Sequence, residues 1–327
     1  MSNASLEKAF ETAYNLKKAL SSVILGRQDT IDLVLTALFA DGHVLLEDYP
    51  GSGKTTLAKT LGRLIDCSSS REEHILPFRR IQFTPDMLPG DVLGVNIFDA
   101  KSSSFRFIHG PVFAHIVLAD ELNRTGPKVQ SAFLECMAEK QVTIDNVTYP
   151  LDDLFFVIGT QNPLDLAGTY PLPQVQLDRF LCRVPMSYVD AVTELHVLEK
   201  EQQIKEMASS ITAVVSRDDI ISARKASQGI HIRSEIRQAI VDIVQLTRNN
   251  PLIQFGASTR AAIMMQSALL GWAIVQGRDF ITEDDLVRLA PFVLLHRLRF
   301  HPGAGEPTEA LRQLMARPIE KLVLSVR

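Results

Sequence analysis

A short glycine-containing stretch near residue 50 has the residue types that bind a chain of phosphates. The strand-like run at residues 43–47 leads into the sequence DYPGSGKT at residues 48–55, and a helix is expected to follow. Gly51 and Gly53 allow the backbone to curl so that successive N–H groups point at one phosphate, and the helix N-terminus adds positive potential. The sequence therefore predicts a phosphate-binding loop between a strand and a helix.

Two side chains of this loop have distinct expected tasks. Lys54 would reach the β- and γ-phosphate oxygens, and the Thr55 hydroxyl would bind Mg²⁺. The first position of the usual G-x-x-x-x-G-K-T pattern is Asp48 here, while the Gly-Ser-Gly-Lys-Thr core is intact. The residues predicted to contact nucleotide in this segment are Pro50, Gly51, Ser52, Gly53, Lys54, Thr55 and Thr56.

Two carboxylates follow a second apolar run. Residues 115–119 are followed directly by Asp120 and Glu121, as expected where a buried parallel strand delivers side chains to the ligand-binding edge of a sheet. Asp120 would hold Mg²⁺ through water, and Glu121 would polarise an attacking water. Taken alone, such a pair is more often a helix start or a pair of surface carboxylates, but a phosphate loop upstream in the same domain favours the catalytic interpretation. A purely metal-binding site is the weaker alternative because no histidine or cysteine cluster accompanies the pair.

One amide and three arginines complete the candidate set. Asn162 follows the apolar run that starts at Leu154 and would fix the same water or a γ-phosphate oxygen, although an Asn before proline is also a common turn residue. Arg260 falls in the first turn of a helix capped by Ser258, where the helix dipole opposes a cation, so an anion such as a γ-phosphate or a nearby acid should compensate. Arg179 and Arg124 are each compatible with a catalytic role or with a structural ion pair.

The secondary structure predicted for the elements that position these groups changes along the chain, from alternating strands and helices to helices alone. Five short apolar runs alternate with helical patterns up to about residue 188, which predicts an α/β fold with a parallel sheet covered by helices on both faces. These runs are residues 43–47, 80–84, 115–119, 154–159 and 182–186. From about residue 190 helical periodicity dominates, and Thr282 before three acidic residues predicts a capped helix. We therefore expect an α/β domain at residues 1–189 and a small all-helical domain at residues 190–327.

Two further stretches of the first domain read as β-hairpins inserted between the sheet strands. One pairs residues 95–98 with 105–108, and the other pairs residues 142–144 with 147–149 around Asp145-Asn146. Pattern alone does not decide whether they serve a function or are ordinary excursions of the sheet.

Composition narrows the class of protein. The 327 residues include 46% hydrophobic ones, enough for two cores, and the net charge of −4 gives no positive field that would attract nucleic acid. Three dispersed cysteines suggest neither disulfides nor a zinc site. The N-terminus lacks the pattern of a signal peptide and no apolar run approaches bilayer length, so we expect a cytoplasmic protein without direct membrane insertion.

Taken together, the motifs resemble those of the MoxR-type AAA+ ATPases across nearly the whole chain. The resemblance rests on LLEDYPGSGKT (45–55), FTPD (83–86), GPVF (110–113), LADELNR (118–124), GTQNP (159–163), GTYPLP (168–173), LDRF (177–180) and GASTRA (256–261). Members commonly carry an acidic residue at the position of Asp48. One departure is Gln174-Val175, where similar proteins have Glu-Ala.

The resemblance implies an AAA+ P-loop core and helical lid that assemble as a ring, usually a hexamer, with Mg²⁺ and ATP at each subunit interface. By matching positions, Asn162 is similar to sensor 1, Arg260 to sensor 2, and Arg179 to the arginine finger that acts on a neighbour's nucleotide. Gly26 and Arg27 lie in a segment similar to the one that lines the adenine pocket. The two hairpins resemble the helix-2 and pre-sensor-1 inserts.

The resemblance also implies a role as a chaperone-like machine that acts with a partner carrying a von Willebrand A domain in maturation or metal insertion. Two other classes of function stay open from the sequence. The chain could be a nucleotide-gated binding module in which ATP only selects a conformation, or a nucleic-acid motor, against which the acidic pI of about 6.1 argues.

Overall fold

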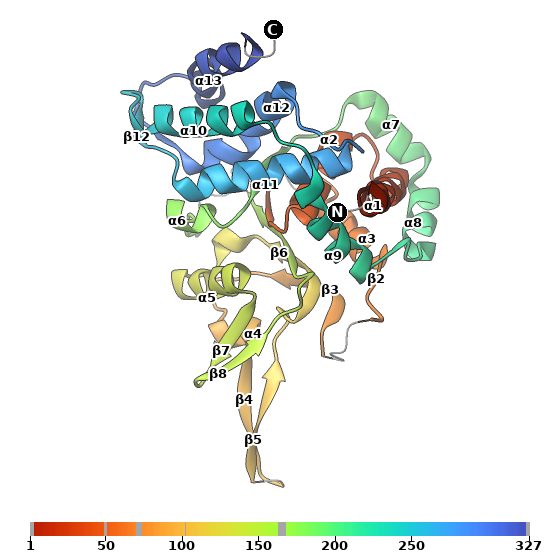
Figure 1. Ribbon diagram of the computed structural model, residues 1–327. Helices are drawn as coiled ribbons and strands as arrows, with labels where there is room; N and C mark the ends of the chain where they lie inside the picture. Colours follow the sequence, from red (N-terminus) through yellow and green to blue (C-terminus); the bar gives the residue numbers. More distant parts are fainter. Residues whose placement is uncertain (1–2, 49–50, 70–73, 102, 163–167, 325–327) are drawn as a thin grey trace.

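A computed structural model of the chain describes residues 3–48, 51–69, 74–101, 103–162 and 168–324 (Figure 1). The central sheet contains five parallel strands in the order β10–β1–β9–β6–β3. Their bounds are β1 (Val44–Asp48), β3 (Leu76–Gln82), β6 (Ala114–Asp120), β9 (Phe156–Gln161) and β10 (Cys182–Met186). The α/β fold with a parallel sheet, predicted from five apolar runs, is confirmed.

The second strand differs from its predicted range because it lies at the edge of the sheet. β3 begins at Leu76 and ends at Gln82, whereas the apolar pattern indicated residues 80–84. An edge strand is paired on one side only, so polar residues such as Arg79 and Arg80 are tolerated within it and obscure its start. β6, by contrast, lies between two strands and is buried at all seven positions.

The sheet lies between two hydrophobic clusters, and successive residues of each strand contribute to opposite ones. Leu46 and Ile158 belong to the cluster that includes residues of α1, α2 and α3. Leu45 and Val157 belong to the cluster that includes residues of α5. This alternation is the consequence of the two-residue repeat of a β-strand. It explains why the strands of the sheet are apolar on both faces.

The helices are α1 (Asn3–Val23), α2 (Gln28–Phe39), α3 (Lys54–Arg63), α4 (Pro89–Leu93), α5 (Pro127–Glu139), α6 (Gln174–Leu177), α7 (Ala191–Glu199), α8 (Glu201–Ser210), α9 (Arg217–Ala226), α10 (Ser234–Arg248), α11 (Thr259–Val275), α12 (Glu283–Leu294) and α13 (Pro307–Leu324). The predicted N-caps are present: the Ser258 hydroxyl accepts the Ala261 N–H at 3.2 Å, and Thr282 forms a capping box with Asp285. None of the helices in the described ranges has the length and apolar character needed to cross a membrane.

Both hairpins are present and project away from the sheet (Figure 1). The first consists of β4 (Gly94–Asp99) and β5 (Ser104–His109), and the second of β7 (Gln141–Ile144) and β8 (Val147–Pro150). The hairpins contact one another: Phe107 stacks on Tyr149 with ring centroids 4.0 Å apart, and Asn96 donates to Asp145 at 2.7 Å. The second hairpin therefore contacts the first through Tyr149 in β8 and through Asp145 in its turn.

The region after residue 190 contacts the first region in two places, through strand β11 (Val215–Ser216) and through helix α11. β11 pairs with β2 (Ile65–Asp66), so the segment that leads into α9 returns to the body of the α/β fold. Helices α10 to α13 form a separate group, together with the short strands β12 (Ile253–Phe255) and β13 (Arg299–Phe300) (Figure 1). α11 lies so close to α2 that a Cβ on Gly271 would be 2.4 Å from the Thr36 carbonyl oxygen. The domain boundary near residue 190 stays a prediction.

Candidate nucleotide site

The predicted phosphate-binding loop connects β1 to α3 at the carboxyl edge of the sheet. Gly51 and Gly53 have φ of +83° and +89°, a conformation that side-chain-bearing residues rarely adopt. A Cβ built on either glycine would meet nothing within 4 Å, so the space over the loop is open. Pro50 lies outside the described residues. The backbone thus has the curl that an anion-binding loop needs, and α3 begins directly after it with Lys54.

The loop and the carboxylate strand meet through one ion pair. Lys54 Nζ lies 3.0 Å from Oδ1 of Asp120, the last residue of β6, although 66 positions separate the two residues in the chain. Strand β9 lies between β1 and β6 in the sheet, and its Thr160 hydroxyl donates to the same Asp120 oxygen at 2.8 Å. The structure therefore brings together the predicted phosphate-binding lysine and the predicted magnesium-binding carboxylate.

Asp120 is held as a carboxylate. Its burial alone would raise its pKa, but hydrogen bonds from Arg80, Thr160 and Lys54 outweigh burial and place the pKa below the ordinary value of 3.8. An ionised carboxylate oxygen and a threonine hydroxyl are oxygen ligands of the kind that Mg²⁺ prefers. Thr55, in the first turn of α3, is half-buried. These two residues fit the predicted magnesium site. No group of three or more histidine, cysteine or acidic ligands occurs among the described residues, so a separate metal centre is not indicated there.

Glu121 adopts a strained backbone conformation immediately after β6. Its φ of 57° and ψ of 47° lie in the left-handed region, which costs a non-glycine residue about 1–3 kcal/mol. Its N–H donates to the Thr160 hydroxyl at 2.9 Å, so one threonine orients both acidic residues. Gln82 donates to Glu121 Oε2 at 2.7 Å, and Arg124 Nε lies 3.2 Å from the same oxygen. The strain turns the carboxylate away from β6 toward these polar groups.

Three residues of the site were missed by the sequence analysis: Arg80, Gln82 and Thr160. Arg80 and Gln82 lie two positions apart on β3 and so point to the same face, where both reach the carboxylates at the end of β6. The only local signal was a pair of polar residues in an otherwise apolar run. That signal cannot indicate a partner forty residues away.

A cavity of about 510 Å³ adjoins the phosphate loop and matches the place expected for the nucleotide base. Its lining combines the loop, the segment after α1 and residues of α7 and α8. The lining residues include Ile24, Arg27, Gly51, Ser52, Gly53, Thr56, Tyr188, Val197, Leu198 and Ile204. Gly26 lies in the same segment as Arg27 with φ +67°, and a Cβ there would be 2.5 Å from Cγ2 of Thr193. An apolar slot next to a phosphate loop suits a purine ring.

The remaining predicted residues are placed as follows. Asn162 directly follows β9, the neighbour of the carboxylate strand. Arg179 donates to the carbonyl of Leu134 in α5. Arg260 has a side chain that is 60% exposed, and its Nη1 is 3.9 Å from Asp178. Among the described residues, neither Arg179 nor Arg260 contacts Lys54 or Asp120.

Asp178 explains why the contact with Arg260 is loose. The buried Arg297 donates to the Asp178 carboxylate at 2.7 Å and to the backbone carbonyls of Phe180 and Leu181. Arg260 is thus a second, more distant cation on a carboxylate that already has a partner. The acid that the sequence analysis allowed as an alternative partner for Arg260 is present, at the outer limit of an ion pair.

Comparisons with known proteins agree with this geometry. A family model described as "ATPase family associated with various cellular activities (AAA)" matches residues 43–182. A model of the AAA lid domain matches residues 245–315. The first range contains the phosphate loop and both carboxylates, and the second contains Arg260.

Individual relatives cover most of the chain. The uncharacterised protein YeaC of Bacillus subtilis is 43% identical over 91% of this chain and 91% of its own length. Chaperone MoxR1 of Mycobacterium tuberculosis is 34% identical over 87% of this chain and 76% of its own length. The crystal structure of a candidate ATPase from Cytophaga hutchinsonii superposes with a TM-score of 0.82 at 35% identity, covering 98% of this chain and 97% of that one.

Proposed function

The chain belongs to the MoxR-type AAA+ ATPases, and on that premise we propose that it binds Mg·ATP and hydrolyses it to drive the remodelling of another protein. The observation that carries the proposal is the 3.0 Å contact between Lys54 Nζ and Asp120 Oδ1. It joins a glycine-curled loop to a buried, ionised carboxylate at the ligand-binding edge of a parallel sheet. Glu121 stands next to this pair with its carboxylate outside β6.

In the proposed mechanism the backbone N–H groups of residues 51–53 and the start of α3 bind the phosphate chain. Lys54 exchanges its contact with Asp120 for the β- and γ-phosphate oxygens, and the cavity beside Arg27 receives the base. Thr55 and Asp120 would hold Mg²⁺, which when bound neutralises charge that develops on the phosphates. Together, these residues would align the γ-phosphate with Glu121.

In this mechanism Glu121 would activate the attacking water. A carboxylate that accepts a proton or polarises the nucleophile typically contributes about 10²–10⁴ in rate. In the structure Gln82 and Arg124 both contact its Oε2, so the carboxylate is anchored through that oxygen. Asn162 follows β9, the strand next to β6, and would hold the same water or a γ-phosphate oxygen.

The test of ATP hydrolysis is the variant Glu121→Gln. It keeps the shape of the side chain and removes the charge, so ATP should still bind while turnover falls by about 10²–10⁴. ATP affinity is measured by calorimetry and turnover by phosphate release. Glu139→Gln, an exposed glutamate at the end of α5, is the matched control and should behave as wild type. Wild-type turnover in Glu121→Gln would remove Glu121 from the mechanism.

We further propose that the active form is a homo-oligomeric ring, with six subunits as the expected number, in which Arg179 acts on the nucleotide of a neighbour. Its lack of contact with Lys54 and Asp120 in its own subunit is consistent with a role across an interface. An arginine supplied in this way raises turnover by about 10³–10⁵ in related phosphoryl transfer.

Two measurements test the ring. Activity per subunit should rise steeply with protein concentration, in step with the mass measured by light scattering. Arg179→Ala should lose activity while it retains ATP affinity, and Arg124→Ala tests the other arginine. A fully active dilute monomer would contradict the assembly.

The remodelling role is supported by the chaperone name of one relative and by the first hairpin. Phe98 and Phe105 at its end are 55% and 72% exposed, which provides apolar surface for a protein partner. We propose that this partner carries a von Willebrand A domain. Affinity purification of Glu121→Gln with ATP or with ADP, followed by mass spectrometry, is the test. Enrichment of such a protein only with ATP supports the proposal, and its absence from both samples contradicts it.

A further inference from the structure

Arg80 makes two hydrogen bonds to the carboxylate that is expected to hold magnesium. Its Nε and Nη2 donate to Asp120 Oδ2 at 3.0 and 2.5 Å. Nη2 also donates to Gln82 Oε1 at 2.7 Å, which fixes the direction of the guanidinium. Charge-assisted bonds of this kind are about twice as strong as neutral ones. The positive charge of the Arg80 guanidinium therefore lies next to the carboxylate at which a divalent cation would bind.

These contacts use the full capacity of the Asp120 carboxylate. Two oxygens provide about four acceptor positions. Oδ1 is engaged by Thr160 and Lys54, and Oδ2 by the two nitrogens of Arg80. A magnesium ion with its coordinated water needs at least one of these positions. One of the present donors must therefore leave before Asp120 can take part in metal binding.

We propose that Arg80 competes with Mg²⁺ for Asp120, so that its guanidinium holds the carboxylate in the metal-free protein and is displaced when the metal is bound. The inference rests on the proposed function, because it assumes that Asp120 serves Mg·ATP. It assigns to Arg80 a role in setting how strongly nucleotide binding depends on magnesium.

Burial and location identify Arg80 as the donor that leaves Oδ2. Thr160 is fully buried and also accepts the Glu121 N–H, so its hydroxyl is fixed. Lys54 is 18% exposed, and its departure toward the phosphates frees one position on Oδ1 but leaves the guanidinium charge of Arg80 on Oδ2. Arg80 is 47% exposed on an edge strand, and its long side chain can turn into solvent without breaking the sheet. A cation that stayed on Oδ2 would repel the metal across a short distance.

The experiment compares nucleotide affinity with and without magnesium. The dissociation constant of a non-hydrolysable ATP analogue is measured by calorimetry in EDTA and in saturating MgCl₂. The constant in EDTA divided by the constant in MgCl₂ gives the factor by which the metal strengthens binding. In Arg80→Gln this ratio should be about fivefold larger than in wild type, as expected for removal of one partly exposed ion pair. The readout needs no hydrolysis.

Two further variants control for charge and fold. Arg79→Gln removes the same charge one position earlier on β3, where the side chain points to the other face, and its ratio should equal that of wild type. Arg80→Lys keeps the charge but loses the second hydrogen bond, so it should show a smaller increase than Arg80→Gln. This variant also provides the answer if Arg80→Gln does not fold.

A ratio in Arg80→Gln equal to that of wild type would overturn the inference. A smaller ratio would overturn it too, because Arg80 would then be helping Asp120 to bind the metal. If wild type binds the analogue in neither buffer, the proposed function itself fails. That result is distinct from normal binding with an unchanged ratio, in which only the role of Arg80 is refuted.

Discussion

At each end of the strands of the central sheet an aspartate is bound by an arginine, but the two pairs serve different purposes. Asp120 closes β6 at the carboxyl edge, and Asp152 precedes β9 at the opposite edge. Both have side chains that are at most 8% exposed, and both have a pKa below 3.8 because hydrogen bonds and cationic partners outweigh the effect of burial. Each is held by an arginine from another element. The difference lies in how exposed that arginine is.

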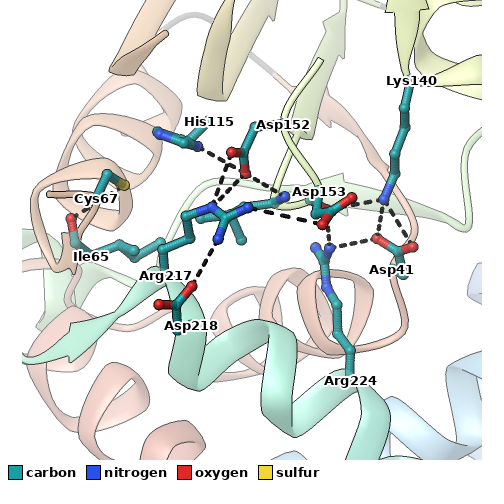
Figure 2. Close-up of polar contacts among 11 residues, drawn as sticks. Asp41, Ile65, Cys67, His115, Lys140, Asp152, Asp153, Arg217, Asp218 and Arg224 are labelled. Atoms are coloured by element: carbon teal, nitrogen blue, oxygen red, sulfur yellow. Dashed lines mark hydrogen bonds and ion pairs between the residues drawn. The ribbon is translucent and has the colours of Figure 1, made fainter. Parts of the chain in front are cut away.

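At the amino end the arginines are enclosed. Figure 2 shows Arg217 and Arg224 of α9 directed at acidic residues beside the sheet. Arg217 Nε donates to both oxygens of Asp152 at 2.8 and 3.0 Å, and its side chain is only 16% exposed. Arg224 donates to the carbonyls of Leu38 and Asp153. These bonds fasten α9 to the sheet, whereas the half-exposed Arg80 at the carboxyl end can be replaced by a ligand.

The largest effect that we expect from substituting the two aspartates is on ATP turnover. Asp120→Asn keeps the shape of the side chain but loses the charge for Mg²⁺, so ATP turnover should fall by at least about 10²-fold. Asp152→Asn makes the same chemical change at the other end and should leave turnover per folded molecule unchanged. Phosphate release, normalised to the folded fraction from circular dichroism, measures both. Similar losses in the two variants would refute the division of roles.

The next effect is on stability. Arg217→Met leaves the largely buried Asp152 carboxylate with His115 but without its arginine, which should lower the free energy of unfolding by about 2–3 kcal/mol. The value is below that for a fully enclosed pair because Arg217 keeps some contact with solvent. Urea denaturation followed by circular dichroism is the measurement. A loss no greater than that of Arg79→Gln would show that the amino-end cluster does not fasten α9.

The dependence of the free energy of unfolding on pH, measured in the acid range, tests the comparison further. Because the pKa of Asp152 is lowered in the folded protein, its contribution is complete above the unfolded pKa near 3.8 and is lost as the pH falls below that value. The stability difference between wild type and Asp152→Asn should therefore shrink below about pH 4. Unfolding curves from pH 6 downward test this. A difference that stayed constant with pH would mean that Asp152 ionises equally in both states.

The smallest effect concerns the outer layer of the amino-end cluster. Lys140 Nζ lies 2.7 Å from Asp41, but Asp41 is 47% exposed (Figure 2). Lys140→Met should change the free energy of unfolding by no more than about 1 kcal/mol. Its comparison with Arg217→Met, in the same denaturation assay, separates burial from the mere presence of an ion pair. A loss as large as that of Arg217→Met would show that exposure does not decide the strength of these bonds.

Much of the architecture was predictable because it depends on near neighbours in the chain. The runs at residues 43–47 and 115–119 contain three and four consecutive apolar residues, and such short runs between helices indicate a parallel sheet covered on both faces. Asp145-Asn146 has the positive φ angles that a tight hairpin turn requires. Ser258 and Thr282 cap the helices that they were expected to cap. The prediction for the edge strand β3 was wrong at its start by four residues, and β9 is displaced by two residues from the predicted range of 154–159.

By itself, the sequence determined the phosphate loop, the strand that ends in Asp120 and the family of the chain, because each of these is written in a continuous stretch of residues. Only the tertiary structure decided that Arg80 and Gln82 reach the two carboxylates and that Arg217 reaches Asp152. Those pairs are 39 to 65 positions apart in the chain. Their meeting depends on strand order, on the register of β3 against β6 and on where α9 returns to the sheet. No local periodicity encodes these three features, since each is set by the packing of the whole core.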